Sequence, residues 1–144
     1  MRAVVQRVRE AHVDVDGETV GRIGTGLLVL VGVGHEDDAD TATALATRLV
    51  HLRIFDDESG RMNRSLLDVG GEMLVVSQFT LWGEVTSGRR PSWSRAAPGE
   101  KAEPLCREFA DAVRAFGLTV AEGRFGASMD VHLVNQGPVT LLFT

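Results

Sequence analysis

The chain has 144 residues, of which 44% are apolar and 24% charged, and its formal net charge is −5. This composition excludes a disordered chain and predicts one domain over residues 1–144 with a single core. The acidic balance argues against binding along a nucleic-acid backbone, which needs many contacts between cationic side chains and phosphates. A local basic patch that holds one end of a nucleic acid remains compatible with it.

Two features predict the compartment. No apolar run approaches the roughly 20 residues that span a membrane, and the first residues contain no apolar signal segment. Cys106 is the only cysteine, so no disulfide can form within the chain. We therefore expect a cytoplasmic protein that is not bound to a membrane.

The first 33 residues predict strands. Residues 1–10 alternate between polar and apolar side chains in a way that is compatible with a bulge, and residues 12–15 alternate regularly. Asp16-Gly17 is a hairpin turn signal, so a second strand is expected over residues 18–23. The continuous apolar run 27–33 predicts a strand that is buried on both faces.

A helix is expected next. The acidic residues Asp37, Asp38 and Asp40 favour a helix start, and the apolar periodicity continues to about Leu52. Residues 55–63 are polar and contain an acidic cluster, but its spacing fits no EF-hand loop. We interpret this segment as a solvated loop and not as a metal site.

The second half of the chain predicts a strand over residues 73–79, a long irregular loop over 83–99 and a helix over 101–116. A loop of that length in a small domain is either functional or disordered. Pro104 must lie in the first turn of the helix or bend it, because proline lacks an N–H group. The predicted apolar stripe of this helix is Leu105, Phe109, Ala112 and Phe116.

Three short strands are expected at the end, over residues 118–122, 128–134 and 139–143. Between the last two lies Gly137-Pro138, which is poorly suited to a strand interior because proline cannot donate to the ladder and glycine packs nothing. The order of the elements predicts a mixed α/β domain with two helices on a sheet.

Several catalytic patterns are missing. The sequence has no GxSxG nucleophile elbow, no GxxxxGK[ST] phosphate loop and no HExxH motif. None of the four histidines is spaced with another for metal ligation, so they are predicted to be structural or surface residues: His12, His35, His51 and His132. We expect neither a metal nor a cofactor.

The stretch VVSQFTLWG, residues 75–83, places Ser77, Gln78 and Thr80 at the end of an apolar strand. These polar groups form either an ordinary strand end or the wall of a pocket. A threonine hydroxyl is a weak nucleophile without an adjacent base, and the sequence offers no obvious base. If the site is catalytic, we expect it to act through backbone N–H groups and positioning.

Four segments carry a resemblance to a known family. They read SQFTLWG at residues 77–83, GRRPSW at 88–93, GRFGA at 123–127 and NQGPVT at 135–140, and the N-terminal MRAVVQRV also matches. In this order and combination the chain resembles the D-aminoacyl-tRNA deacylases over essentially its whole length. The fold expected on this basis has mixed and antiparallel β-sheets in a barrel-like arrangement, with two main helices packed on one face in three layers, α/β/β.

The resemblance implies a cytoplasmic homodimer with its sites at the subunit interface. It would hydrolyse the ester between a D-amino acid and the 3′-terminal adenosine of tRNA, reject L-aminoacyl esters and also accept glycyl esters. Gly137-Pro138 would form a cis peptide that enters the partner's pocket as a chiral selector, braced by Arg7 and Asn135. The implied facing wall is Ser77, Gln78, Phe79 and Thr80; the implied adenosine pocket is Phe125 and Met129; the candidate tRNA contacts are Arg89, Arg90, Arg95 and Lys101.

The expected mechanism is attack of water on the ester carbonyl. A backbone N–H within residues 78–80 would polarise the carbonyl oxygen, and the ribose 2′-hydroxyl would assist. Main-chain carbonyls aimed at the α-carbon would collide with an L side chain but not with hydrogen, so discrimination would come from repulsion. Two alternatives stay open: a hydrolase of small esters that uses Thr80 or Ser77 as nucleophile, and a non-enzymatic dimer that binds nucleotides or tRNA ends.

Overall fold

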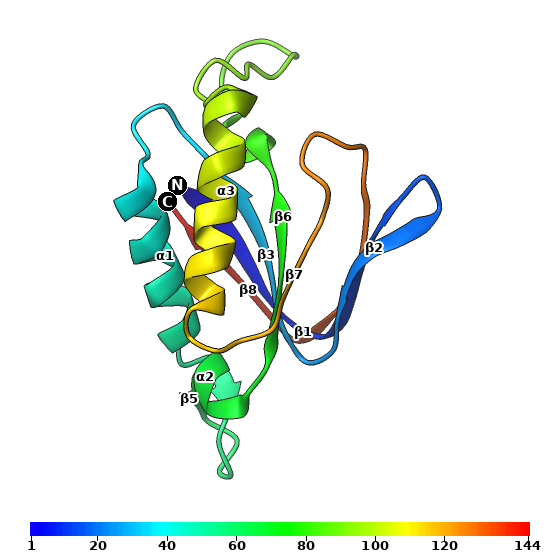
Figure 1. Cartoon of the computed structure of the whole chain (residues 1–144), viewed down its shortest axis with the longest axis vertical. Helices are drawn as coiled ribbons and strands as arrows, with labels where there is room; N and C mark the ends of the chain where they lie inside the picture. The colour runs from blue at the N-terminus through cyan, green and yellow to red at the C-terminus, as the bar shows by residue number, and fades with distance from the viewer.

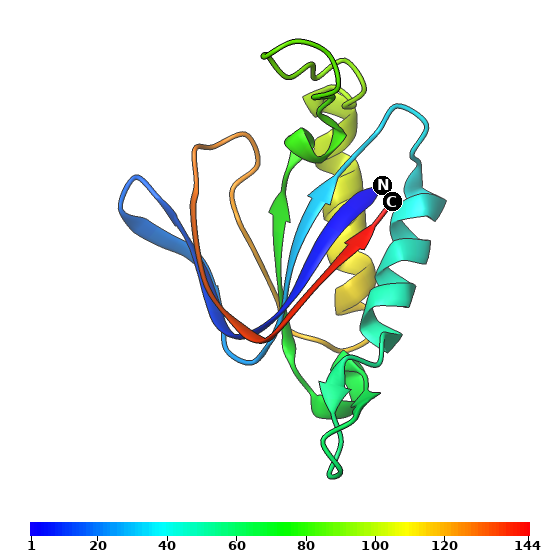
Figure 2. The same ribbon diagram turned by 180° about the vertical axis from the view of Figure 1, so that it is seen from behind.

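The computed structural model describes all 144 residues. Figures 1 and 2 show one strongly curved sheet with two long helices on one side of it. The strands are β1 Arg2–Val15, β2 Glu18–Ile23, β3 Gly26–Gly32, β4 Phe55–Asp56, β5 Met62–Arg64, β6 Glu72–Ser77, β7 Val120–Glu122 and β8 Asp130–Phe143. The helical segments are α1 Ala39–His51, α2 Leu66–Val69, the 3₁₀ turn η1 Phe79–Trp82 and α3 Gly99–Arg114.

The main sheet has six strands in the order β2-β1-β3-β6-β7, with β8 paired to the other edge of β1. The pairs that involve β1 are antiparallel, whereas β3–β6 and β6–β7 are parallel. The sheet curls until β2 approaches β7: a Cβ added to Gly21 would lie 2.5 Å from the carbonyl oxygen of Glu122. The mixed, barrel-like sheet is thus confirmed.

The buried apolar residues form three clusters, and the two larger ones separate the three layers. The larger one lies between the sheet and the helices α1 and α3, and it includes Leu49, Phe109 and Val29. The second lies inside the curl of the sheet and includes Val8, Val13 and Leu74. The predicted arrangement of two main helices on one face is therefore confirmed, with the short α2 in addition (Figure 1). None of the helices has both the length and the apolar character needed to cross a bilayer.

Helix α1 begins at the predicted acidic cluster. Asp38 is its N-cap and exchanges hydrogen bonds with Thr41, whose backbone N–H donates to the Asp38 carboxylate at 2.9 Å. This hydrogen bond lowers the pKa of Asp38 below its ordinary value. The cap closes the first turn, so the acidic residues mark the start of the helix as expected.

Helix α3 differs from the expectation in two ways. It begins at Gly99, so Pro104 lies in the second turn and not the first. Its buried stripe is also rotated from the predicted one, because Phe116 is exposed beyond the helix end and only Phe109 belongs to both sets. The buried residues of α3 are Ala102, Cys106, Phe109, Ala110 and Val113.

The predicted loop over residues 55–63 contains a small hairpin, β4–β5. Its first residue, Phe55, is buried in the main core. The polar composition of the segment did not predict this burial. The carboxylate of Asp57 accepts the backbone N–H groups of Ser59 and Arg61 at 2.8 and 3.0 Å. Asp57 of the predicted acidic cluster therefore closes the turn between β4 and β5.

Two strand boundaries were wrong. The strand predicted over residues 73–79 ends at Ser77, where the chain turns into η1. The last two predicted strands are one continuous strand, β8, which passes through Gly137-Pro138. Between Gln6 and Val8 of β1, the partner residues run from Thr140 to Asn135, so β8 uses more residues than β1 over the same length. The extra residues form a bulge opposite Arg7.

The close contact between β3 and β6 generates a stability prediction. A Cβ added to Gly26 would lie 1.8 Å from the backbone oxygen of Glu72, so Gly26→Ala has to separate the two strands. We expect a loss of about 3 kcal/mol or more in the free energy of unfolding, measured by urea denaturation. At Gly24 the nearest atom is the flexible Glu72 carboxylate at 3.4 Å, so Gly24→Ala is the matched control. Equal stability of the two variants would contradict the prediction.

Candidate functional site

The main chain at the end of β6 is held by contacts with the neighbouring strand β3. The backbone N–H of Gln78 donates to the carbonyl oxygen of Val31 at 2.7 Å, which continues the parallel ladder by one residue. A Cβ on Gly32 would lie 2.8 Å from the Gln78 oxygen. Glycine is required there because the two backbones approach so closely. The path of residues 77–79 is thus set by β3.

The turn η1 is held in place at its last residue, Trp82. Its indole packs against Gly34, where an added Cβ would lie 2.6 Å from the ring. The Arg2 guanidinium lies over the same indole, 4.1 Å from the ring centroid, and Nη1 of Arg2 donates to the carbonyl oxygen of Leu81 at 3.0 Å. A cation over an indole face is favourable, so Arg2 holds η1 through both its charge and its hydrogen bond.

Two backbone N–H groups at the start of η1 have no hydrogen-bond acceptor within the protein, those of Phe79 and Thr80. The Thr80 hydroxyl is exposed and accepts a hydrogen bond from the Gln78 side-chain amide. No histidine, carboxylate or lysine contacts that hydroxyl. The segment therefore offers main-chain donors to a ligand and lacks a base that could activate Thr80.

An apolar cavity of about 450 Å³ opens beside this segment. Phe125 and Met129, predicted from the family resemblance, line it together with Ser77, Gln78 and Phe79. Small residues at the start of α3, Gly99 and Ala102, leave the space open. The volume lies within the roughly 300–1,000 Å³ typical of small-molecule sites. The full lining is Val33, Val76, Ser77, Gln78, Phe79, Ala97, Gly99, Ala102, Phe125, Gly126, Ala127, Met129 and Val131.

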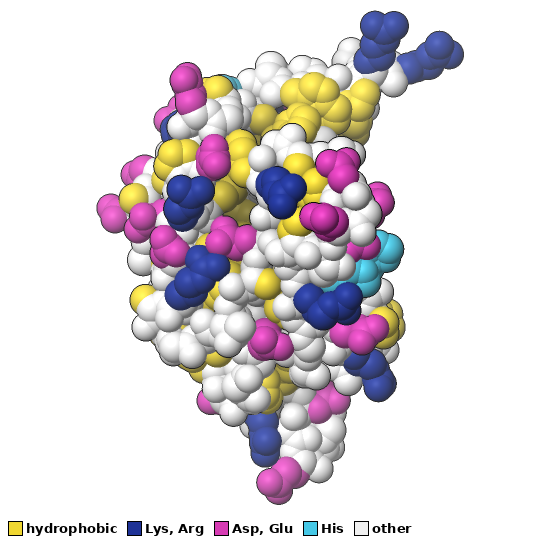
Figure 3. All heavy atoms as spheres, turned by 45° about the vertical axis from the view of Figure 1, so that its right-hand side comes forward, with side chains coloured by type: hydrophobic (Ala, Val, Ile, Leu, Met, Phe, Trp, Pro, Cys, Tyr) yellow, Lys and Arg dark blue, Asp and Glu magenta, His cyan; other side chains and the backbone are white.

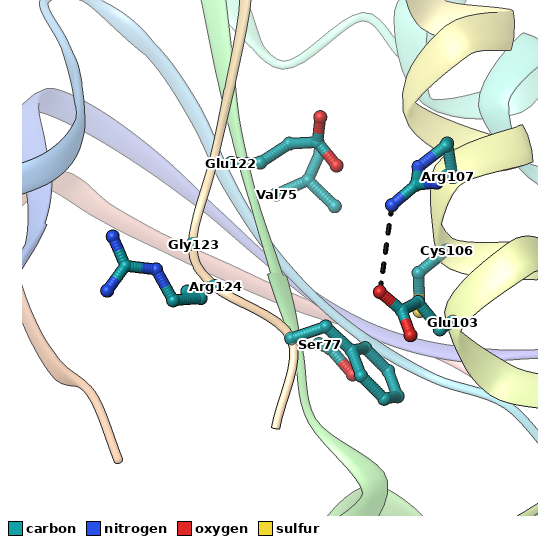
Figure 4. A pocket seen from close by; sticks show the side chains of 9 residues that line it. Val75, Ser77, Glu103, Cys106, Arg107, Glu122, Gly123 and Arg124 are labelled. Atoms are coloured by element: carbon teal, nitrogen blue, oxygen red, sulfur yellow. Dashed lines mark ion pairs between the residues drawn. The ribbon is translucent and has the colours of Figure 1, made fainter. Parts of the chain in front are cut away.

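A second, more polar cavity of about 290 Å³ adjoins the first and shares Ser77 and Phe125 with it. Figure 4 shows Glu103 and Arg107 of α3 on one side of it, joined by an ion pair at 3.6 Å. Cys106 lies on the same helix, and burial raises the pKa of its thiol, which keeps it protonated. This cavity was not among the sites predicted from the sequence. The one sequence feature that could have indicated the cavity is the pair of opposite charges four residues apart, Glu103 and Arg107.

The segment around Gly137 is braced from inside by Arg7, only 6% of which is exposed. The guanidinium donates from Nε to the Gln136 carbonyl at 3.2 Å and from Nη1 to the Ile54 carbonyl at 2.7 Å. Asn135 donates from its amide to the carbonyl oxygens of Arg7 and Val139, both at 3.0 Å. The peptide Gly137-Pro138 is cis, and Gly137 has a φ of +116°. The side chains of Arg7 and Asn135 thus hold in place the main chain at Gly137-Pro138, which forms a projection from the strand.

Within one chain this projection lies far from the wall at residues 77–80. Ser77 pairs with Val31 and Val31 with Ala3, whereas the projection lies opposite Arg7. The two segments are thus separated by four residues along the strands and by three strand spacings across the sheet. At 3.3 Å per residue and 4.8 Å per strand, the separation measured along the sheet is about 19 Å. The structure does not bring these two predicted parts of the site together within one chain.

Residues 4–144 match the family described as D-Tyr-tRNA(Tyr) deacylase. The chain belongs to this family.

Its relatives cover nearly the same length. The D-aminoacyl-tRNA deacylase of Thermosipho africanus is 56% identical over 142 residues, 99% of this chain and 95% of the relative. That of Thermomicrobium roseum is 60% identical over 141 residues, 98% of this chain and 92% of the relative.

Two solved structures have the same fold as this family member. The c-Myc DNA Unwinding Element Binding Protein superimposes with a TM-score of 0.93 at 40% identity, and the match covers 100% of this chain and 98% of that one. A probable eukaryotic D-amino acid tRNA deacylase superimposes with a TM-score of 0.85 at 20% identity, over 99% of this chain and 97% of the other. The second likeness is one of fold alone.

In this family member the loop over residues 83–98 presents basic side chains at one end of the molecule. Figure 3 shows such side chains projecting beyond an apolar surface. Arg89 and Arg90 are exposed and belong to none of the ion pairs. Arg95 differs from them, because it pairs with Glu84 at 2.9 Å. Exposed apolar residues of this end are Phe79, Val85 and Trp93, and the rings of Phe79 and Trp93 meet edge to face at 5.4 Å.

The bracing of the projection generates a second prediction. Arg7→Met keeps an apolar stem but leaves the carbonyls of Gln136 and Ile54 without their charged donor, so the free energy of unfolding should fall by about 2–4 kcal/mol. Arg9, on the same strand, is exposed and forms no ion pair, so Arg9→Met should change it by less than about 0.5 kcal/mol. Chemical denaturation measures both. If Arg7→Met left the free energy of unfolding unchanged, the guanidinium would not be what holds the segment around Gly137.

Proposed function

We propose that this protein hydrolyses the ester bond of D-aminoacyl-tRNA and releases tRNA and a free D-amino acid. The observation that carries the proposal is the apolar cavity lined by Phe125 and Met129, which adjoins the unbonded N–H groups of Phe79 and Thr80 in a chain of the deacylase family. The cavity suits a flat base, and the two donors suit an ester carbonyl beside it.

In the proposed complex the terminal adenine of tRNA occupies the apolar cavity. The ester then lies along residues 77–80, where the N–H groups of Phe79 and Thr80 donate to the carbonyl oxygen as negative charge develops on it. Water attacks the carbonyl carbon, and the bond to the ribose 3′-oxygen breaks. The ribose 2′-hydroxyl assists by taking the proton of the water and delivering one to the 3′-oxygen, so no protein base is needed.

The proposed selector is the main chain of Gly137-Pro138 from a second copy of the chain. Because this segment lies about 19 Å from the wall of its own subunit, only a partner can place it there. Strand β8 is a 14-residue edge strand, with exposed apolar side chains at Val134 and Leu142. An edge of this kind favours association with another chain. We therefore propose a homodimer whose sites lie at the interface.

A selector made of main-chain atoms acts through repulsion. It excludes a side chain in the L position, and it does not distinguish D side chains from one another. Glycine has no side chain, so glycyl-tRNA is also a proposed substrate. The selector and its braces, Arg7 and Asn135, thus define the chirality of the substrate and not its identity.

The proposed partner is the acceptor end of tRNA. Reading only this end needs few phosphate contacts, which is consistent with a net charge of −5. Arg89 and Arg90 are the first candidates for these contacts, because both are exposed and free of ion pairs. Arg95 would contribute after leaving Glu84, and Lys101 after leaving the carbonyl of His35. The protein would act in the cytoplasm as a single domain.

The decisive experiment is deacylation of matched D- and L-aminoacyl-tRNA by the purified protein, with Thr80→Ala in parallel. We expect hydrolysis of the D ester alone. The Thr80→Ala rate should remain within about tenfold of the original, because the proposed donors are backbone groups that the substitution keeps. An inactive Thr80→Ala protein would make the hydroxyl the nucleophile. A protein that binds D-aminoacyl-tRNA without cleaving it would refute the proposed activity.

The selector generates its own prediction. A Cβ on Gly137 would lie 2.8 Å from Nη2 of Arg7, and its φ of +116° is strained for alanine. Gly137→Ala should therefore displace the segment and reduce the ratio of D to L deacylation rates at least about tenfold. Gly60→Ala is the matched control, because Gly60 also has a positive φ but lies in open space. Unchanged chiral discrimination in Gly137→Ala would remove this segment from the mechanism.

A further inference from the structure

Three side chains with metal-ligating atoms meet on the outer face of the sheet, away from the cavities described above. They are His12 and Asp14 of β1 and His132 of β8. The register of the two strands sets His12 directly opposite His132. Since side chains alternate along a strand, these three point away from the inner core, toward which their neighbours point: Ala11, Val13, Val131 and Leu133. No pattern in the sequence indicated this cluster, because 119 residues lie between the two histidines.

The distances between the ligating atoms match those of a small coordination site. Nε2 of His12 lies 3.6 Å and Nε2 of His132 3.4 Å from the same oxygen of Asp14. Ligands bound at about 2.0–2.1 Å in a tetrahedral site are roughly 3.3 Å apart. The two histidine–carboxylate separations are therefore close to the required edges. Neither is short enough to be a good hydrogen bond, so the three groups face one another without satisfying one another.

The Asp14 carboxylate is oriented toward the two histidines by a hydrogen bond to its other oxygen. The hydroxyl of Thr19 on β2 donates to Oδ1 of Asp14 at 2.6 Å, which leaves Oδ2 directed at the two imidazoles. A hydrogen bond to the free oxygen of a ligating carboxylate is a common device that orients metal ligands.

The two imidazole rings stack, with centroids 4.3 Å apart and 5° between their planes. For both Nε2 lone pairs to meet one ion, at least one ring must turn. His132 has the space to do so, because 51% of its side chain is exposed. The required change is one of side-chain rotation, and the backbone of the two strands already has the necessary spacing.

We propose that His12, Asp14 and His132 bind one transition-metal ion of the zinc class, with water completing the coordination. Two imidazoles and one carboxylate favour Zn²⁺, Ni²⁺ or Cu²⁺ over Mg²⁺ and Ca²⁺, which take oxygen ligands. The ion bridges β1 and the edge strand β8, three residues before Asn135. Its effect is therefore to clamp β8 at the base of the Gly137 segment, and this role does not depend on the proposed enzymatic activity.

One neighbouring charge opposes the ion. Arg22 of β2 is the cross-strand partner of His12, and its charge acts on Asp14. A cation at this distance repels a bound metal ion. Arg22→Gln should therefore bind the metal more tightly than the original protein, a result that a purely structural histidine pair would not produce.

The test is isothermal titration calorimetry of tag-free protein with ZnCl₂ and NiCl₂ at neutral pH, together with thermal unfolding in the presence and absence of Zn²⁺. We expect one ion per chain and a higher Tm with the metal. His12→Gln and His132→Gln should each weaken binding at least about tenfold, and Thr19→Val should weaken it about tenfold through the loss of its hydrogen bond to Asp14.

Two controls separate this site from others. His51→Gln removes an exposed histidine on α1 and should bind Zn²⁺ as the original protein does. With Co²⁺, visible spectra should show ligand-field bands without the thiolate charge-transfer band that binding at Cys106 would produce. Absence of binding, or His12→Gln and His132→Gln variants that bind like the original, would overturn the proposal. Normal binding by these variants with a thiolate band would assign the ion to Cys106 instead.

Discussion

The pairing of β1 with β8 is the constraint on which the rest of the structure depends. The two strands run side by side over almost their whole length (Figure 2), yet opposite Arg7 the second uses more residues than the first. Each strand must keep its ladder on both sides of the mismatch, so the extra residues have to leave the plane of the sheet. The buried guanidinium of Arg7 then donates to the carbonyl of Gln136 beside the mismatch, and it also donates to the carbonyl of Ile54, just before β4.

The candidate site uses main-chain geometry where many hydrolases use side chains. Gly32 and Gly34 let the strand β3 and the ring of Trp82 approach closely, and this packing sets the path of residues 77–80. The N–H groups of Phe79 and Thr80 are left without partners as a consequence. Backbone donors held this rigidly need no reorganisation when charge develops on a substrate, which is the basis of electrostatic catalysis.

The regular elements were largely predictable because their signals are local. Alternation identified the early strands, and the acidic residues around Asp38 marked the start of α1. The errors arose where tertiary contacts override local pattern. The strand predicted to reach Phe79 stops at Ser77, because the chain turns there to pack Trp82 on Gly34. The buried stripe of α3 was misplaced, because a helix with apolar residues on neighbouring faces does not reveal which face meets the sheet.

By itself the sequence predicted most of the element types, the family and the candidate residues of the wall and of the proposed adenosine pocket. Only the tertiary structure decided how these residues lie in space. It brought Phe125 and Met129 to the wall at Ser77, separated Gly137 from that wall, and paired His12 with His132. The physical reason is that capping and alternation depend on neighbours within a few residues, whereas strand register depends on packing of the whole sheet.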